Sequence, residues 1–65
     1  MEIGEKIKAY VDEHGIMQKF LAEKAGITPS QMSLVMSGQR TLNVIEYYNI
    51  CKALNVPMEY FMEEI

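Results

Sequence analysis

The stretch that decides the fold is QKFLAEKAGITPSQMSLVMSGQR, residues 18–40. Its apolar residues recur at intervals of three and four, the period of a helix with one buried face. Gly26 divides the stretch, because glycine accepts a left-handed backbone conformation that a side chain would penalise. A helix start follows: Thr28 caps the helix, Pro29 suits its first position, and Gln31 closes a capping box. The stretch therefore predicts two short helices joined by a tight turn of three to four residues.

The rest of the chain continues the helical period and shows no alternation of period two. A second capping box is predicted at Asn43, with Glu46 three residues further on. Gly15, Gly38 and Asn55 are typical of helix ends. The expected helices cover residues 3–14, 18–24, 29–37, 44–54 and 58–63. A chain of 65 residues has room for one core only, so we expect a single all-α domain of five helices, residues 1–65.

The spacing of apolar residues also predicts which side of each helix is buried. In the third helix the buried side holds Met32 and Val35, whereas the other faces carry mostly short hydroxyl side chains. The predicted core consists of Ile3, Ile7, Tyr10, Val11, Leu21, Ala22, Ala25, Met32, Val35, Val44, Tyr47, Tyr48, Cys51, Leu54 and Phe61.

Charge and composition narrow the function classes. The net charge of −3 argues against a nucleic-acid partner, but most acidic residues lie near the two ends of the chain. Between Ile16 and Thr41 three basic residues face one acidic residue, which leaves a local charge of +2. Cys51 is the single cysteine, which favours the reducing cytoplasm, and neither a signal peptide nor a membrane-spanning run is present. We expect a cytoplasmic chain that makes no contact with a membrane.

Catalytic patterns are missing from the sequence. It contains no Ser-His-Asp set, no glycine-rich phosphate loop followed by lysine, and no carboxylate pair with a pocket to hold it. His14 has neither a cysteine nor a second histidine near it and is interpreted as a helix-end residue. We therefore expect no enzyme activity, no cofactor and no metal site.

Residues 18–40 resemble the Cro and lambda-repressor family of helix-turn-helix regulators, also called the xenobiotic-response-element family. The likeness rests on Gln18, Leu21-Ala22, Gly26, the apolar Ile27, Met32 and Val35, and Gly38, and it extends through Leu54-Asn55-Val56. Asn55 departs from the family pattern, which has glycine there. The resemblance implies a five-helix lambda-repressor-like domain whose third helix enters the major groove of double-stranded DNA. It also implies that the protein regulates transcription as a repressor.

The resemblance also implies site residues. Gln18 falls where members meet a backbone phosphate, and Pro29, Ser30 and Leu34 fall where they read base edges, with Ser33 beside them. Ser37, Gln39 and Arg40 fall where members hold flanking phosphates, and Arg40 is the preferred phosphate contact. The full candidate DNA-binding set is Gln18, Lys19, Thr28, Pro29, Ser30, Gln31, Ser33, Leu34, Ser37, Gln39 and Arg40.

Several of these positions also have an ordinary structural interpretation. Gln31 serves the capping box if it does not read a base, and Lys19 is equally typical of a solvated face. Pro29 offers no donor, and Leu34 offers only apolar contact, for instance with a thymine methyl group. Because direct readout by such residues is weak, we expect modest affinity, assisted by dimer avidity or DNA shape.

Two kinds of protein partner remain open at this point. Met58, Tyr60 and Met62 surround Phe61 with more apolar surface than one short helix can bury, which favours a homodimer face. The acidic total and the poor reading helix favour an alternative, in which the same fold binds another protein as an antirepressor or an antitoxin-like subunit.

Overall fold

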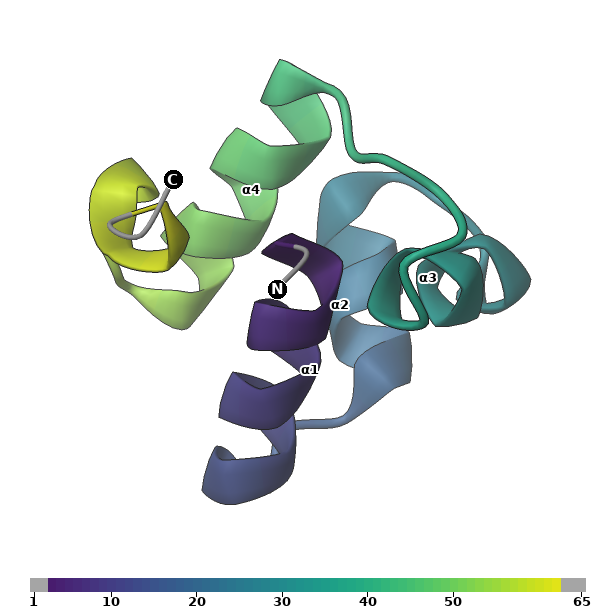
Figure 1. Cartoon of the computed structure of the whole chain (residues 1–65), viewed down its shortest axis with the longest axis horizontal. Helices are drawn as coiled ribbons and strands as arrows, with labels where there is room; N and C mark the ends of the chain where they lie inside the picture. The colour runs from purple at the N-terminus through teal and green to yellow at the C-terminus, as the bar shows by residue number, and fades with distance from the viewer. Residues whose placement is uncertain (1–2, 63–65) are drawn as a thin grey trace.

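The computed structural model describes residues 3–62, and these residues contain helices and no strand. The α-helices are α1 (Ile3–His14), α2 (Gln18–Ala25), α3 (Pro29–Met36) and α4 (Val44–Leu54), followed by the 3₁₀ helix η1 (Met58–Phe61) (Figure 1). The predicted all-α class is confirmed. The last segment is a single 3₁₀ turn in place of a fifth α-helix, and Glu63, where that helix is predicted to end, lies outside the described residues.

Both predicted capping boxes are present. In α3 the Thr28 hydroxyl accepts from the Gln31 amide N–H at 3.1 Å, and the Gln31 side-chain oxygen accepts from the Thr28 N–H at 2.9 Å. In α4 the Asn43 side chain accepts from the Glu46 N–H at 2.8 Å, and the Glu46 carboxylate accepts from the Asn43 N–H at 3.1 Å. Each box satisfies two backbone donors that a helix start otherwise leaves unpaired, so both helices begin at the residues that the sequence predicts.

The turn between α2 and α3 is formed by Gly26, Ile27 and Thr28. Gly26 has a left-handed backbone with φ of 79°, and the N–H groups of Gly26 and Ile27 both donate to the carbonyl of Ala22 at 3.0 Å. This arrangement ends α2 one residue later than predicted and redirects the chain. In Figure 1 α2 runs vertically and α3 lies across that direction, so the pair crosses as a helix-turn-helix requires.

The core lies where α1, α2, α3 and α4 meet, with Ile7, Leu21, Met32 and Ile50 completely buried. Most of the predicted core is confirmed. The buried residues are Ile7, Val11, Leu21, Ala22, Ala25, Met32, Val35, Met36, Tyr47, Ile50, Cys51, Leu54 and Phe61, whereas Ile3 and Tyr10 are half-buried against them.

The prediction for α4 is wrong at two positions. Val44 is 72% exposed and Tyr48 is 48% exposed, whereas Ile50, absent from the predicted stripe, is completely buried. The face that α4 turns toward α2 follows the spacing of Tyr47, Ile50 and Leu54. Val44 stands in the first turn of α4, and Tyr48 follows one turn later. Because residues four apart lie on the same side of a helix, both stand on the solvent side of α4.

Contacts from two helices, α1 and α4, hold η1 in place. The Tyr47 hydroxyl of α4 donates to the Met58 carbonyl, and Lys6 Nζ of α1 donates to the Phe61 carbonyl at 3.3 Å. The ring of Tyr10 meets the ring of Phe61 edge to face at 5.7 Å between centroids. The C-terminal turn is therefore attached to both α1 and α4.

Tyr47 gives this attachment a measurable pH dependence. Burial raises the pKa of Tyr47 to about 12 from an ordinary value of 10.0, so the folded state holds the phenolic proton more tightly than the unfolded state does. This contribution to stability is complete below pH 10 and is lost as the pH rises through about 12. We expect Tyr47→Phe to lower the free energy of unfolding near pH 8 by about 1 kcal/mol through the lost hydrogen bond. Above pH 10, the free energy of unfolding should decrease less with rising pH in this variant than in the wild type.

Urea denaturation near pH 8 and near pH 11 measures both effects. Tyr48→Phe is the matched control, because Tyr48 lies on the same helix and is about half exposed. The same alkaline loss of stability in wild type and Tyr47→Phe would contradict the assignment.

Candidate nucleic-acid interface

The side of α3 that faces away from the core is exposed along its whole length. Met32, Val35 and Met36 point inward and are buried. The exposed residues of this segment are Thr28, Pro29, Ser30, Gln31, Ser33, Leu34 and Ser37, and we call this surface the outer face of α3. Because α3 lies across α2, no other part of the described chain covers this face (Figure 1).

The remaining predicted site residues lie on α2 and on the segment after α3. Lys19 and Gln39 are exposed, and Gln18 and Arg40 are half-buried. Gln18 is the first residue of α2, and Arg40 lies in the segment that joins α3 to α4. The predicted set therefore comes from α2, α3 and the segments on either side of α3, and all of its members are exposed or half-buried.

Hydrogen bonds within the chain already engage part of this set. The side-chain oxygen of Gln31 is held in the capping box, which confirms its structural role. The Ser37 hydroxyl donates to the Leu34 carbonyl at 3.1 Å and accepts from Gln39 Nε2 at 3.0 Å. These bonds fix the end of α3. Ser30 and Ser33 are the hydroxyl side chains of α3 whose donors remain available to a ligand.

Arg40 is paired with an acid that lies beside the site. Its Nη1 and Nη2 donate to the two carboxylate oxygens of Glu46, each at 3.1 Å, and Nη1 also donates to the Thr41 carbonyl at 3.3 Å. The hydrogen bond from Arg40 holds the pKa of Glu46 below its ordinary value, with a further contribution from the Asn43 N–H. Glu46 is therefore ionised and offsets the charge of Arg40.

Sequence reasoning assigned Glu46 only to the cap of α4 and missed this pairing. Two residues of opposite charge separated by a loop give no local signal, since the loop conformation decides whether they meet. The signal in retrospect is that the capping box itself orients Glu46: its Oε1 accepts from Asn43 N–H and from Arg40.

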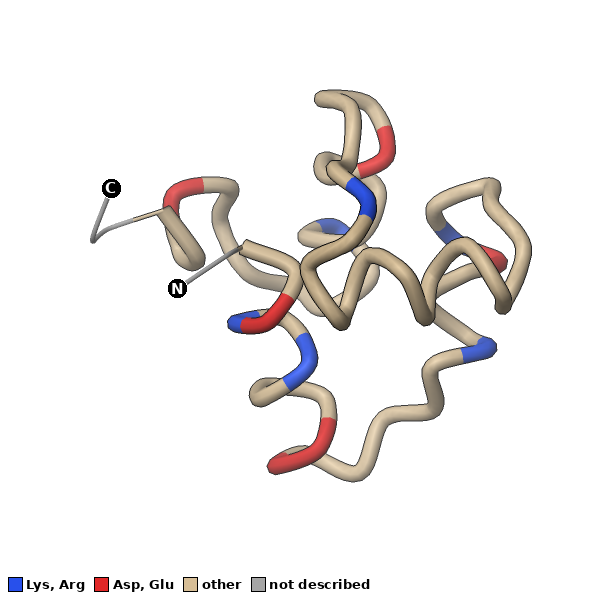
Figure 2. Tube along the Cα trace, turned by 45° about the vertical axis from the view of Figure 1, so that its right-hand side comes forward, with Lys and Arg blue, Asp and Glu red and all other residues tan. Residues whose placement is uncertain are grey.

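The outer face of α3 carries no charge. The basic residues of the described chain lie on α1, α2 and α4 and at Arg40, and α3 itself contains neither a basic nor an acidic residue (Figure 2). A surface of this kind does not repel a polyanion, but it attracts one only through its borders.

The start of α2 differs from the starts of α3 and α4. Its N-cap residue, Met17, provides no side-chain hydrogen bond, whereas Thr28 and Asn43 provide one in the other two helices. The N–H groups in the first turn of α2 therefore lack a side-chain acceptor. An uncapped helix start next to Gln18 suits an anion such as a phosphate group.

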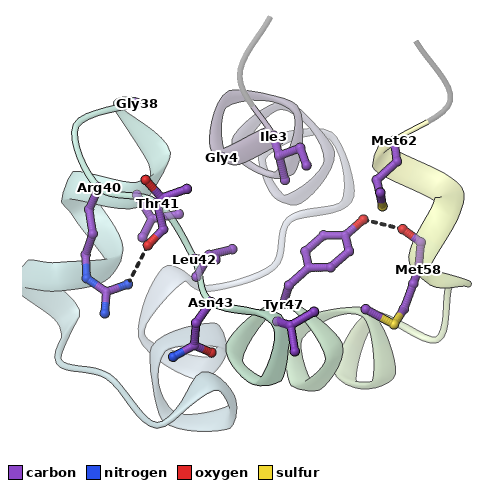
Figure 3. Close-up of a pocket in the computed structure, with 12 residues that line it drawn as sticks. Ile3, Gly4, Gly38, Arg40, Thr41, Leu42, Asn43, Tyr47, Met58 and Met62 are labelled. Atoms are coloured by element: carbon purple, nitrogen blue, oxygen red, sulfur yellow. Dashed lines mark hydrogen bonds between the residues drawn. The ribbon is translucent and has the colours of Figure 1, made fainter. Parts of the chain in front are cut away.

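A pocket of about 520 Å³ lies next to Arg40, between the start of α1, the segment before α4 and η1. Figure 3 shows Ile3, Leu42, Tyr47, Met58 and Met62 turned toward it, with Arg40 and Asn43 at its border. Its lining is mainly apolar. The pocket adjoins the Arg40 end of the interface and is separate from the outer face of α3.

A grouping of three His, Cys, Asp or Glu side chains that suits a metal ion does not occur among residues 3–62. His14 is the last residue of α1, where its Nδ1 lies 2.9 Å from the Tyr10 carbonyl and its ring stacks on Tyr10, as its helix-end interpretation implies. Cys51 is buried.

Two short helices that cross at a glycine turn, the second with a fully accessible outer side, define a helix-turn-helix protein. A family model described as helix-turn-helix matches residues 7–61. The chain therefore belongs to the helix-turn-helix family of the Cro and lambda-repressor type, whose domains bind DNA and regulate transcription.

Two further findings accompany this assignment. No curated protein matches the chain. Among residues 3–62, no helix has both the length and the apolar character that crossing a membrane requires.

Proposed function

We propose that this protein is a sequence-specific transcriptional repressor that places α3 in the major groove of double-stranded DNA. The observation that carries the proposal is the accessible, uncharged outer face of α3, held across α2 by the turn at Gly26. A major groove about 12 Å wide admits a helix presented in this way. The chain is expected to act in the cytoplasm as one DNA-binding domain spanning residues 1–65.

Two groups of residues divide the work of binding. Residues at the borders meet phosphates and set the position of the protein, and residues on α3 meet base edges and provide specificity. The proposed phosphate group comprises Gln18, Lys19, Ser37, Gln39 and Arg40, supported by the uncapped start of α2. The proposed base-reading group comprises Thr28, Pro29, Ser30, Gln31, Ser33 and Leu34, in which Gln31 has only its amide N–H donors free.

A homodimer through the C-terminal turn completes the proposal. Tyr60 and Met62 are 46% and 43% exposed, which supports their assignment to a dimer face. Met58 is half-buried and packs against the core, so it contributes less surface than its neighbours. A two-fold dimer places its two α3 helices in successive major-groove turns, about 34 Å apart.

Arg40 provides the first test. If Arg40 meets a phosphate, Arg40→Gln removes one released counterion and lowers the slope of log affinity against log salt by about 1. Fluorescence anisotropy with a labelled duplex over a salt series measures this slope, and the binding stoichiometry reports whether two chains bind together. Thermal unfolding verifies that the variant is folded.

Lys52→Gln is the matched control, because it makes the same change in charge in the last turn of α4. Tighter binding is expected for Glu46→Gln, because this substitution retains an oxygen for the cap and removes the acid that pairs with Arg40. Equal salt slopes for wild type and Arg40→Gln would remove Arg40 from the phosphate contacts.

The alternative, a protein-interaction module, is favoured by two observations. Val44 and Ile45 at the start of α4 are 72% and 68% exposed, and the net charge of the chain is −3. Adjacent exposed apolar residues suit a protein partner better than a polyanion. Failure to bind any duplex at low salt, together with a partner whose binding depends on Ser30 and Arg40, would replace the proposed function with this one.

A further inference from the structure

Leu34 is the large apolar side chain on the outer face of α3. It is 43% exposed, whereas Met32, Val35 and Met36 of the same helix are buried. Ser30 and Ser37 lie four and three residues away, on the same side of the helix. Leu34 therefore stands among hydroxyl side chains on the surface that the proposed function turns toward DNA.

The backbone at Leu34 is firmly held. Its carbonyl accepts from the N–H of Gln39 at 2.8 Å, from the N–H of Arg40 at 3.1 Å and from the Ser37 hydroxyl at 3.1 Å. Three hydrogen bonds to one carbonyl fix the last turns of α3 relative to the following loop. The Cα–Cβ bond of Leu34 consequently has a defined direction on the outer face of α3, which a residue that recognises one particular base requires.

The groups that commonly distinguish bases by hydrogen bonding are scarce on this face. Arginine or lysine reads guanine and asparagine or glutamine reads adenine through paired hydrogen bonds, and α3 contains none of these except Gln31. The Gln31 oxygen is already bonded to the Thr28 N–H, so Gln31 is not free for the paired contact with adenine. A serine hydroxyl can form a hydrogen bond with several different bases, so Ser30 and Ser33 discriminate little between base pairs.

The major groove contains one apolar group that differs between bases, the C5 methyl group of thymine. We infer that the DNA sites this protein prefers place a thymine against Leu34, and that Leu34 recognises its methyl group. The inference rests on the proposed function and names the sequence feature that the same surface selects. Burial of the methyl group against Leu34 removes apolar surface of both from water, which is favourable without any hydrogen bond.

Replacement of thymine by deoxyuridine tests the inference directly, because uracil has the same hydrogen-bonding groups and lacks the methyl group. Binding duplexes are first enriched from a random-sequence pool with the wild-type chain. The affinity is then measured for the enriched duplex and for versions in which single thymines are replaced by deoxyuridine. In each half-site we expect one thymine whose replacement, made singly, weakens wild-type binding about fourfold. This is the value for burying one methyl-sized group.

Two variants assign the effect to its residue. Leu34→Ala is expected to bind the thymine and deoxyuridine duplexes equally. Ile45→Ala, which truncates an exposed apolar side chain outside the proposed binding set, should retain the fourfold preference. The wild-type comparison needs no variant and stands even if Leu34→Ala unfolds. Binding without any thymine preference, or a preference that survives Leu34→Ala, would overturn the inference and leave the proposed function intact. Failure to enrich or bind any duplex at low salt would instead overturn the proposed function.

Discussion

Ser33→Glu is expected to weaken binding to duplex DNA by about a hundredfold or more, since like charges brought together at an interface cost several kcal/mol. Ser33 is exposed in the middle of the outer face of α3, where the proposed complex brings the groove and both phosphate backbones close to the helix. No basic residue of α3 is present to offset the added charge. Fluorescence anisotropy with an enriched duplex at low salt measures the loss.

The stability of the domain should not change with this substitution. Because Ser33 makes no packing contact in the core, the melting temperature of Ser33→Glu is expected to match that of the wild type. Lys52→Gln changes the net charge by the same amount on α4 and is expected to bind DNA with nearly unchanged affinity. Equal losses in the two variants would show that total charge, rather than the outer face of α3, governs binding.

Gly4→Ala is expected to lower the free energy of unfolding by about 2 kcal/mol, within the range for overpacking a tight contact. A Cβ atom at position 4 would lie 1.9 Å from the carbonyl oxygen of Val35 and 2.8 Å from its carbonyl carbon. These are backbone atoms of α3, so the clash is relieved only if α1 and α3 separate or the first turn of α1 opens. In an exposed helix the same substitution stabilises by about 1 kcal/mol, so the tertiary contact reverses the sign.

Urea denaturation followed by circular dichroism measures this change. Ala9→Gly, at an exposed position of α1, is the control for helix propensity and should cost about 1 kcal/mol. A higher unfolding midpoint for Gly4→Ala would mean that propensity outweighs the contact with Val35. The substitution should also weaken DNA binding, because Val35 belongs to the helix that carries the proposed reading residues.

Much of the candidate site follows from local sequence. The start of α3 was predictable because Thr28, Pro29 and Gln31 interact within one helical turn. Its outward side was predictable because inward residues recur with the helical period, which places Ser30 and Leu34 opposite the core. The pairing of Arg40 with Glu46 was not, since it depends on the path of the loop between them.

The sequence by itself determined where α2, α3 and α4 begin and that Gly26 separates a helix-turn-helix pair, because caps, turns and periodicity act between residues a few positions apart. Only the tertiary structure decided that α4 buries Ile50 and leaves Val44 and Tyr48 exposed, because α2 selects the face it covers. The same holds for Gly4, whose role arises from the approach of α1 to the Val35 carbonyl. Contacts between elements far apart in the chain leave no local pattern from which to predict them.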